Sequence, residues 1–274
     1  MSAADGEAKV REHVIDGIFV RDSGPIDGRP LVFGHSLLFD GRMWEAQVAD
    51  LEKDHRCINL DFRGHGQSTP PPRGFSMLAQ ADDYRKVMDA LGVERATMVG
   101  LSMGGMAAMH FAVAHPARVV ALALFDTSAE VEPPKARAKE TALAVTARVF
   151  GINDFLLKQV APIMWSARFR AERADVTKVW DERMQALNKT AAYRAVRMVL
   201  TRPAVGPRLG DVRVPTLVVV GDEDVATRPS KAKKIAETIA GAELRILPRT
   251  GHISAVEEPE VVTKLLRSFL ARTA

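Results

Sequence analysis

Gly100-Leu101-Ser102-Met103-Gly104-Gly105 follows a short apolar run, Ala96–Val99, and precedes a stretch of helix-forming residues, Met106–Ala114. A sharp turn from a strand into a helix lifts a serine hydroxyl clear of the sheet. It also crowds the residues two positions before and after the serine, so both must be small. The same turn places the N–H of Met103 at a helix N-terminus, where a developing negative charge is stabilised. These six residues predict a nucleophilic serine, Ser102, at the carboxyl end of a buried strand.

Short apolar runs alternate with amphipathic stretches on both sides of this turn. The pattern is typical of an α/β fold with a mostly parallel central sheet flanked by helices. Strands are expected at Val14–Val20, Leu31–Phe33, Cys57–Phe62, Ala96–Val99, Val119–Phe125, Thr216–Val220 and Leu244–Leu247. Helices are expected around Trp44–Lys53, over Ser76–Leu91 and Met106–Ala114, and around Pro259–Leu270. The first strand is expected to lead into a turn at Asp22-Ser23-Gly24.

One region interrupts this alternation. From Glu130 to Arg208 the chain holds no convincing strand, only helix-forming sequence rich in Ala, Arg, Lys, Leu and Met. The sequence thus predicts a core domain made of residues 1–129 and 209–274, with a helical lid, residues 130–208, inserted between two core strands. Its large apolar residues either face a pocket or pack the lid onto the core, and packing is favoured for each of them: Phe155, Leu156, Met164, Trp165, Trp180, Met184 and Met198.

Composition excludes several classes of protein. The 274 residues are 47% hydrophobic and 26% charged, which excludes a disordered chain and a collagen-like or coiled-coil rod. The single cysteine, Cys57, excludes a disulfide framework and a cysteine-ligated metal cluster. No apolar run approaches the roughly 18 residues of a membrane span. Met1–Val10 lacks the apolar region of a secretion signal, so a cytoplasmic protein is expected.

The formal net charge of +4 raises the question of nucleic acid binding. The basic excess lies in Glu130–Arg208, which holds 15 basic and 8 acidic residues. There the charges alternate at helical spacing and few aromatic residues are present to stack on bases. A solvated helix face is therefore expected rather than a phosphate-binding patch, with no nucleic acid as partner. No membrane partner is expected either, because no apolar run is long enough to span a bilayer.

A serine nucleophile needs a base and a carboxylate to orient that base. His252 follows the last expected strand, on the edge of the sheet where open α/β sheets build their sites. The favoured carboxylate is Asp224, which follows Thr216–Val220 and lies just beyond a turn; Asp222 and Asp126 are the alternatives. The order serine, aspartate, histidine is the order of the α/β-hydrolase triad.

Three further segments make the resemblance specific. Asp61–Ser68 is similar to a D-x-R-G-x-G-x-S loop, and Gly251-His252 is followed by Glu258-Pro259 as in a G-H-x-x-x-x-E-x-P region. Gly34–Leu37 lies where an H-G-x segment is usual. With the serine turn, these segments resemble the α/β-hydrolase superfamily over nearly the whole chain. Within it, His35-Ser36-Leu37 and Arg42-Met43-Trp44 most resemble the 3-oxoadipate enol-lactonase and small carboxylesterase group.

The resemblance implies an oxyanion hole formed by the backbone N–H groups of Leu37 and Met103. It implies loop-stabilising rather than chemical roles for Arg63 and His65. The reaction it implies is hydrolysis of a small-molecule carboxylic ester or lactone through an acyl-enzyme, with no metal or organic cofactor.

The same scaffold also supports other activities, which the sequence leaves open. These are a carbon–carbon bond hydrolase acting on a vinylogous diketone, a cofactor-free perhydrolase and a non-catalytic ligand receptor. The basic excess of the lid could attract a substrate that carries a carboxylate, or could be surface only. The sequence predicts no oligomeric state.

Overall fold

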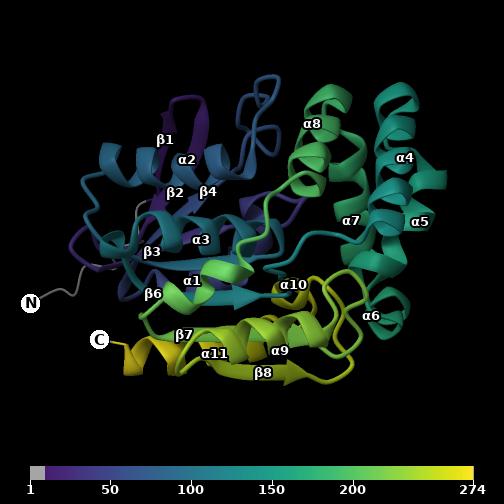
Figure 1. Ribbon diagram of the computed structural model, residues 1–274. Coiled ribbons are helices and arrows are strands. Elements are labelled where there is room, and N and C mark those ends of the chain that lie inside the picture. Colours follow the sequence, from purple (N-terminus) through teal and green to yellow (C-terminus); the bar gives the residue numbers. More distant parts are fainter. Residues whose placement is uncertain (1–9, 274) are drawn as a thin grey trace, which may run out of the picture.

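A computed structural model describes residues 10–273, which form one eight-stranded sheet in the order β1-β2-β4-β3-β5-β6-β7-β8 (Figure 1). The two pairs at the β1 edge, β1 with β2 and β2 with β4, are antiparallel, and the other neighbours are parallel. The strands are β1 (Arg11–Ile15), β2 (Ile18–Ser23), β3 (Arg29–Gly34), β4 (His55–Leu60), β5 (Ala96–Leu101), β6 (Val119–Phe125), β7 (Thr216–Gly221) and β8 (Glu243–Leu247). The expectation that the N-terminal segment is not a secretion signal concerns residues 1–9, which lie outside the described residues.

The single strand expected at Val14–Val20 is wrong, because this stretch is a hairpin. Asp16 and Gly17 have φ angles of +51° and +77° and connect β1 to β2, with Ile15 opposite Ile18. An Asp-Gly pair is favoured in such a two-residue turn because both positions need a positive φ. The apolar residues on either side obscured this turn in the sequence.

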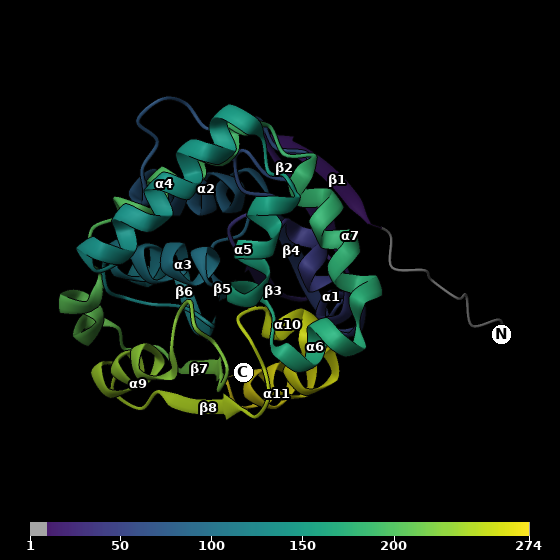
Figure 2. The ribbon, with the colours of Figure 1, turned by 90° about the vertical axis from the view of Figure 1, so that its right-hand side faces the viewer.

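Helices cover both faces of the sheet, as Figure 2 shows. The helices α2 (Met77–Ala90), α3 (Met103–Ala114) and α9 (Pro229–Thr238) lie on one face. The other face is covered by α1 (Glu45–Leu51) and α11 (Pro259–Arg272), with the short α10 (Ser254–Glu257) beside them. Helix α9 was not predicted, because its charged sequence hides a narrow apolar stripe that includes the buried Ala232 and Ile235.

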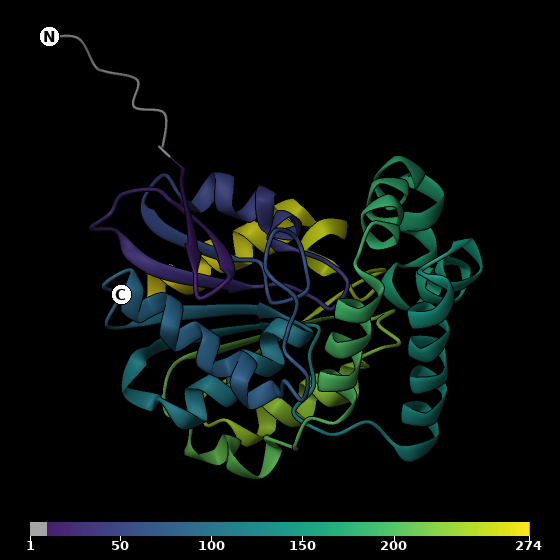
Figure 3. The same cartoon turned by 90° about the horizontal axis from the view of Figure 1, so that it is seen from above.

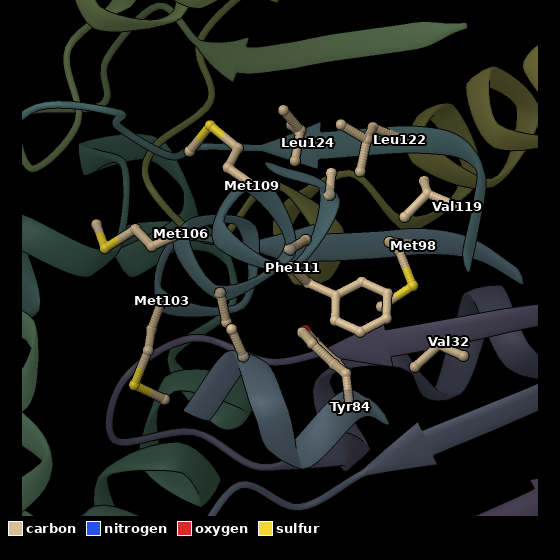
Figure 4. Close-up of a cluster of buried hydrophobic side chains, with 14 of the residues drawn as sticks. Val32, Tyr84, Met98, Met103, Met106, Met109, Phe111, Val119, Leu122 and Leu124 are labelled. Carbon is tan, nitrogen blue, oxygen red and sulfur yellow. The ribbon is translucent and has the colours of Figure 1, made fainter. Parts of the chain in front are cut away.

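Alternation along the buried strands divides the core between these two faces. In β6, Leu122 and Leu124 point toward α3, whereas Ala123 belongs to the cluster beneath α1 and α11. Figure 4 shows the first of these layers, where Phe111 and Met109 of α3 meet the strand residues. The central strands β5, β6 and β7 are buried almost completely on both sides, and their sequences are therefore almost continuously apolar, whereas the edge strand β8 is partly exposed.

Between β6 and β7, the described residues form the helices α4 (Pro134–Phe150), α5 (Asp154–Met164), α6 (Ala167–Glu172), α7 (Ala174–Gln185) and α8 (Lys189–Leu200). We call residues 130–208 the helical insertion. It lies beyond the carboxyl ends of the parallel strands, at the right of Figure 1. Trp165 and Trp180 pack against Phe39 of the core, with ring centroids 5.6 and 4.6 Å away. No helix in residues 10–273 is both long and apolar enough to cross a membrane.

Candidate active site

Ser102 stands at the turn between β5 and α3 in a strained backbone conformation, with φ +53° and ψ −113°. The turn brings Gly104 so close to β3 that a Cβ atom there would lie 2.1 Å from the Gly34 carbonyl oxygen. A Cβ atom at Gly100 would lie 2.5 Å from the backbone of Gly104. No side chain fits at either position, so these glycines are what allow the strained turn to form.

Neighbouring parts of the core hold this turn in place. The Ser102 N–H donates to the Phe125 carbonyl oxygen at 2.9 Å, and the Thr127 hydroxyl donates to the Ser102 carbonyl oxygen at 2.7 Å. Both partners belong to the end of β6 and the residues that follow it. The position of Ser102 therefore depends on β6, on the residues that follow it and on α3, all of which lie outside the helical insertion.

The structure brings together three of the residues that the sequence singles out. The Ser102 Oγ atom lies 2.9 Å from His252 Nε2, and His252 Nδ1 lies 2.9 Å from Asp224 Oδ2. The N–H groups of Ala226 and Thr227 donate to Asp224 Oδ1 at 2.8 Å, and the Thr227 hydroxyl donates to Oδ2 at 2.7 Å. These donors fix the carboxylate so that it receives the Nδ1 proton of His252, which leaves Nε2 free to accept a proton from Ser102.

Neither of the alternative carboxylates is hydrogen-bonded to the imidazole. Asp222 is exposed and accepts from the N–H of Thr250, in the loop after β8, at 3.4 Å. Asp126 is fully buried and accepts from the Gly221 N–H at 2.9 Å and from the Ser254 hydroxyl. It therefore connects the ends of β6 and β7 to the loop that carries the histidine.

The electrostatics of the three residues match this arrangement. Burial disfavours the imidazolium, but the adjacent Asp224 carboxylate outweighs it and raises the pKa of His252 above its ordinary value. Burial likewise opposes the Asp224 carboxylate, yet His252 and the Thr227 donors hold the pKa of Asp224 below its usual range. Burial and the charge of Asp224 raise the pKa of Asp126 to about 8. Of the two buried carboxyls, Asp224 is the one held as an anion at neutral pH.

The two N–H groups expected to bind an oxyanion flank Ser102. Within residues 10–273, neither the Leu37 nor the Met103 N–H donates a hydrogen bond. The next residue, Leu38, has a φ of +67°, and its N–H donates to His65 Nε2 at 3.1 Å. His35 Nε2 accepts from the Phe62 N–H at 2.8 Å. These contacts give the loop a fixed conformation that leaves both N–H groups available.

Both histidines in this region are neutral. Burial lowers the pKa of His35 to about 4 and the pKa of His65 to about 3. Each ring uses Nε2 to accept from the backbone, which it can do only without a proton at that atom. Arg63 forms an ion pair with Asp83 at 2.8 Å. His65 and Arg63 thus hold loops, in the way that the resemblance implied.

The helical insertion holds the loop that carries His252. The Met164 carbonyl oxygen accepts from the N–H groups of His252 and Ile253 at 3.1 and 3.2 Å. Two residues farther along, the Ser166 hydroxyl and N–H donate to the buried carboxylate of Glu257 at 2.6 and 3.0 Å. Glu257 also accepts from the Gly251 N–H at 3.2 Å. One short segment of the insertion therefore fixes both sides of the histidine.

Sequence reasoning missed the roles of Thr227, Met164, Ser166 and Glu257. Only Glu257 carried a signal: counted from Gly251, the glutamate of the G-H-x-x-x-x-E-x-P pattern falls on Glu257, one residue before the Glu258-Pro259 pair quoted for it. The contact of Ser166 with Glu257 spans 91 residues, and no local pattern indicates such a distant partner.

A cavity of about 580 Å³ opens beside Ser102 and His252, between the core and the insertion. Its wall is largely apolar. Leu156, Met164 and Met184 line this cavity, so the expectation that such residues only pack the insertion onto the core is wrong for these three. Met164 and Met184 also pack against buried core residues. Phe155 does neither, because its side chain points into solvent. The direction of each side chain depends on how the helices rotate, which composition does not reveal.

The model of the alpha/beta hydrolase fold family matches residues 29–259 of this chain. The 3-oxoadipate enol-lactonase 1 of Acinetobacter baylyi is 27% identical over 256 residues, which cover 92% of each chain. A putative carbamate hydrolase of Variovorax paradoxus is 28% identical and covers 92% of this chain and 95% of its own.

Solved structures give the same result. A thermophilic esterase from Thermogutta terrifontis superposes with a TM-score of 0.88 at 28% identity, over 97% of this chain and 99% of that one. The enol-lactonase from Burkholderia xenovorans has a TM-score of 0.88 at 29% identity, over 95% and 100% of the two chains. The predicted resemblance to enol-lactonases and carboxylesterases is confirmed. The chain belongs to the α/β-hydrolase fold family.

Proposed function

We propose that this chain is a serine hydrolase that cleaves a carboxylic ester or lactone of a small, largely apolar molecule. Ser102 is the nucleophile, His252 the general base and Asp224 the carboxylate that orients it. The observation that carries the proposal is the continuous contact from Ser102 Oγ through His252 to Asp224, with 2.9 Å at each step, at the wall of a cavity.

The reaction follows from these positions. His252 Nε2 takes the proton of Ser102 as Oγ bonds to the carbonyl carbon, and the carbonyl oxygen becomes an oxyanion between the N–H groups of Leu37 and Met103. Each such donor stabilises the transition state by about 3 kcal/mol. The carbon–oxygen bond to the leaving alcohol then breaks, and His252 gives its proton to that oxygen. A water molecule releases the acyl group from Ser102 by the same steps.

The cavity indicates which substrates fit. Two carboxylates and two cations line it, Glu132, Glu140, Arg228 and Lys231, and the charge of Glu132 is balanced by ion pairs to Arg202 and Lys231. The cavity therefore carries no net positive charge that would select a carboxylate. Most of the wall is aliphatic, so an uncharged acyl or alcohol group is the favoured occupant. No cofactor takes part in these steps.

The helical insertion, residues 130–208, is proposed to act as the lid of this site. Support comes from its side chains, which line the cavity opposite Ser102, and from Met164, which contacts the histidine loop. In this proposal residues 1–129 and 209–274 form the core domain. A cytoplasmic location stays a prediction from the sequence.

A panel of p-nitrophenyl esters, enol lactones and ring-fission dienones tests the proposal. Hydrolysis of esters or lactones is expected, with longer aliphatic acyl groups preferred to acetate, and with turnover lost in Ser102→Ala. Two results would contradict it: an alanine variant as active as the parent, or a protein that cleaves only the dienone.

A further inference from the structure

The outer face of α4 carries an apolar stripe with no partner among the described residues. Ala138, Ala142, Val145 and Val149 are spaced by four, three and four positions, so they lie on one side of the helix. All four are exposed, with 45% of Val145 and 58% of Val149 accessible. The opposite side of α4 lines the cavity through residues such as Leu143 and Ala147. Because a helix normally needs one apolar face, this second face requires another explanation.

Two exposed phenylalanines lie just beyond the stripe, at the end of α4 and the start of α5. Phe150, the last residue of α4, is 70% exposed, and Phe155 in the first turn of α5 is 64% exposed. Among the described residues, these are the two aromatic side chains that are large, apolar and exposed. Val145, Val149, Phe150 and Phe155 lie within eleven consecutive residues, so large exposed apolar side chains are concentrated in this stretch of the chain.

Positive charge borders this stripe on both sides. The exposed Lys135 and Lys139 lie along one border, and the exposed Arg137 and Arg148 along the other. None of the four forms an ion pair with a described carboxylate, and the one acidic residue of α4, Glu140, lines the cavity. On this helix the charges do not alternate with acids, contrary to the expectation of an ordinary solvated face.

We propose that this surface, made of the α4 stripe with Phe150 and Phe155, docks on an anionic lipid surface. An apolar face bordered by cations is what a helix needs to lie in a membrane interface, with its apolar side among the acyl chains and its cations at the phosphates. Helix α4 lies at the outer edge of the molecule in Figures 1 and 3, where a flat surface reaches it. The sequence-based expectation of no membrane partner concerned a span, and here the contact is peripheral.

The charge of this surface favours an anionic lipid surface over a second copy of the chain as its partner. Two copies that met through this surface would bring eight unpaired cations together, which opposes association. An anionic lipid surface instead attracts each cation and releases counterions. Docking would place the cavity, lined by the inner side of the same helix, next to a phase in which apolar esters dissolve. This proposal does not depend on the proposed chemistry, because it concerns the outer side of α4.

Co-sedimentation of the full chain with vesicles tests the proposal. Vesicles of phosphatidylcholine mixed with phosphatidylglycerol are expected to carry the protein down, whereas phosphatidylcholine alone is not, and added salt is expected to release it. Phe150→Ser with Phe155→Ser is expected to weaken binding about tenfold, as is Lys135→Gln with Lys139→Gln. Leu78→Ser with Ile26→Ser is the matched control, since these side chains are 55% and 59% exposed outside the insertion. It should change binding less than about twofold.

Three results would overturn the proposal. One is failure to sediment with the anionic vesicles while ester hydrolysis is normal. Another is a dimer that becomes monomeric in Phe150→Ser with Phe155→Ser, measured by light scattering, which would assign the surface to a second copy. The third is equal loss of binding in the control variant. Because all substituted side chains are exposed, unchanged thermal unfolding is expected in every variant.

Discussion

Ser102 and His252 touch each other, yet different parts of the molecule hold them. Ser102 is fixed by the sheet, through Phe125 and Thr127, and by the close approach of Gly104 to β3. His252 is fixed from the helical insertion, through Met164 and through Ser166 on Glu257. The proposed nucleophile is thus held within the core, whereas the proposed base is held both by the core, through Asp224 and Asp126, and by the insertion. Changes in the insertion should therefore alter proton transfer without loosening the serine turn.

The largest effect on kcat is expected for Asp224→Asn, which changes the residue that orients His252. An amide at this position favours the wrong tautomer of His252, so kcat should fall about 10⁴-fold with little change in KM. Stopped-flow or steady-state kinetics on a p-nitrophenyl ester measures this. Asp222→Asn is the control, since Asp222 makes no contact with the imidazole, and it should retain activity within about twofold. Equal losses of kcat in the two variants would contradict the assignment of Asp224 as the carboxylate that orients His252.

A substitution in the turn that holds Ser102 is expected to lower the stability of the fold rather than kcat alone. Gly104→Ala places a Cβ atom 2.1 Å from the Gly34 carbonyl oxygen, deep in the core, and should lower the free energy of unfolding by more than about 3 kcal/mol. Chemical denaturation measures this loss. Gly210→Ala is the matched control, because no atom lies within 4 Å of the added Cβ, and it should be neutral. A stable Gly104→Ala variant would mean that the turn is not as tight as described.

Glu257→Gln tests the attachment of the base to the insertion. The amide keeps one acceptor oxygen but loses the charge that holds Ser166 and Gly251, so kcat is expected to fall about 10- to 100-fold while KM changes little. Glu258→Gln is the control, since Glu258 pairs with Arg168 near the surface. A merely structural role for Glu257 would lower the thermal midpoint and leave kcat of the folded enzyme unchanged.

The smallest effect is expected in the pH profile. The base must be neutral to act, and Asp224 raises the pKa of His252, so kcat/KM should decline as the pH falls through a value above 6.5. The charge of Glu257 contributes to that raised pKa, so in Glu257→Gln the acid limb should move to lower pH. A shift of the acid limb to higher pH in this variant would contradict the claim that the charge of Glu257 raises the pKa of His252.

What could be predicted from the sequence was encoded locally. The turn around Ser102 and the segments after β7 and β8 can each be recognised from a few neighbouring residues. The buried central strands can be recognised from their apolar runs. The hairpin at Asp16-Gly17 was also local, but the apolar residues around it favoured one longer strand.

The rest depends on contacts between distant segments. Nothing near Ser166 in the sequence indicates that its hydroxyl meets Glu257, and nothing near Met164 indicates that its carbonyl holds the histidine loop. The lining of the cavity could not be predicted for the same reason, since Leu156 lines it while the adjacent Phe155 is exposed. Helix rotation and docking decide such details, and both follow from packing over the whole chain.

Mass spectrometry of the protein quenched during turnover of a p-nitrophenyl ester shows directly whether Ser102 is the nucleophile. We expect an acyl group on the peptide that contains Ser102 in the parent protein, and no such adduct in Ser102→Ala or His252→Ala. An acyl group on another residue, or steady turnover with Ser102 replaced, would contradict it.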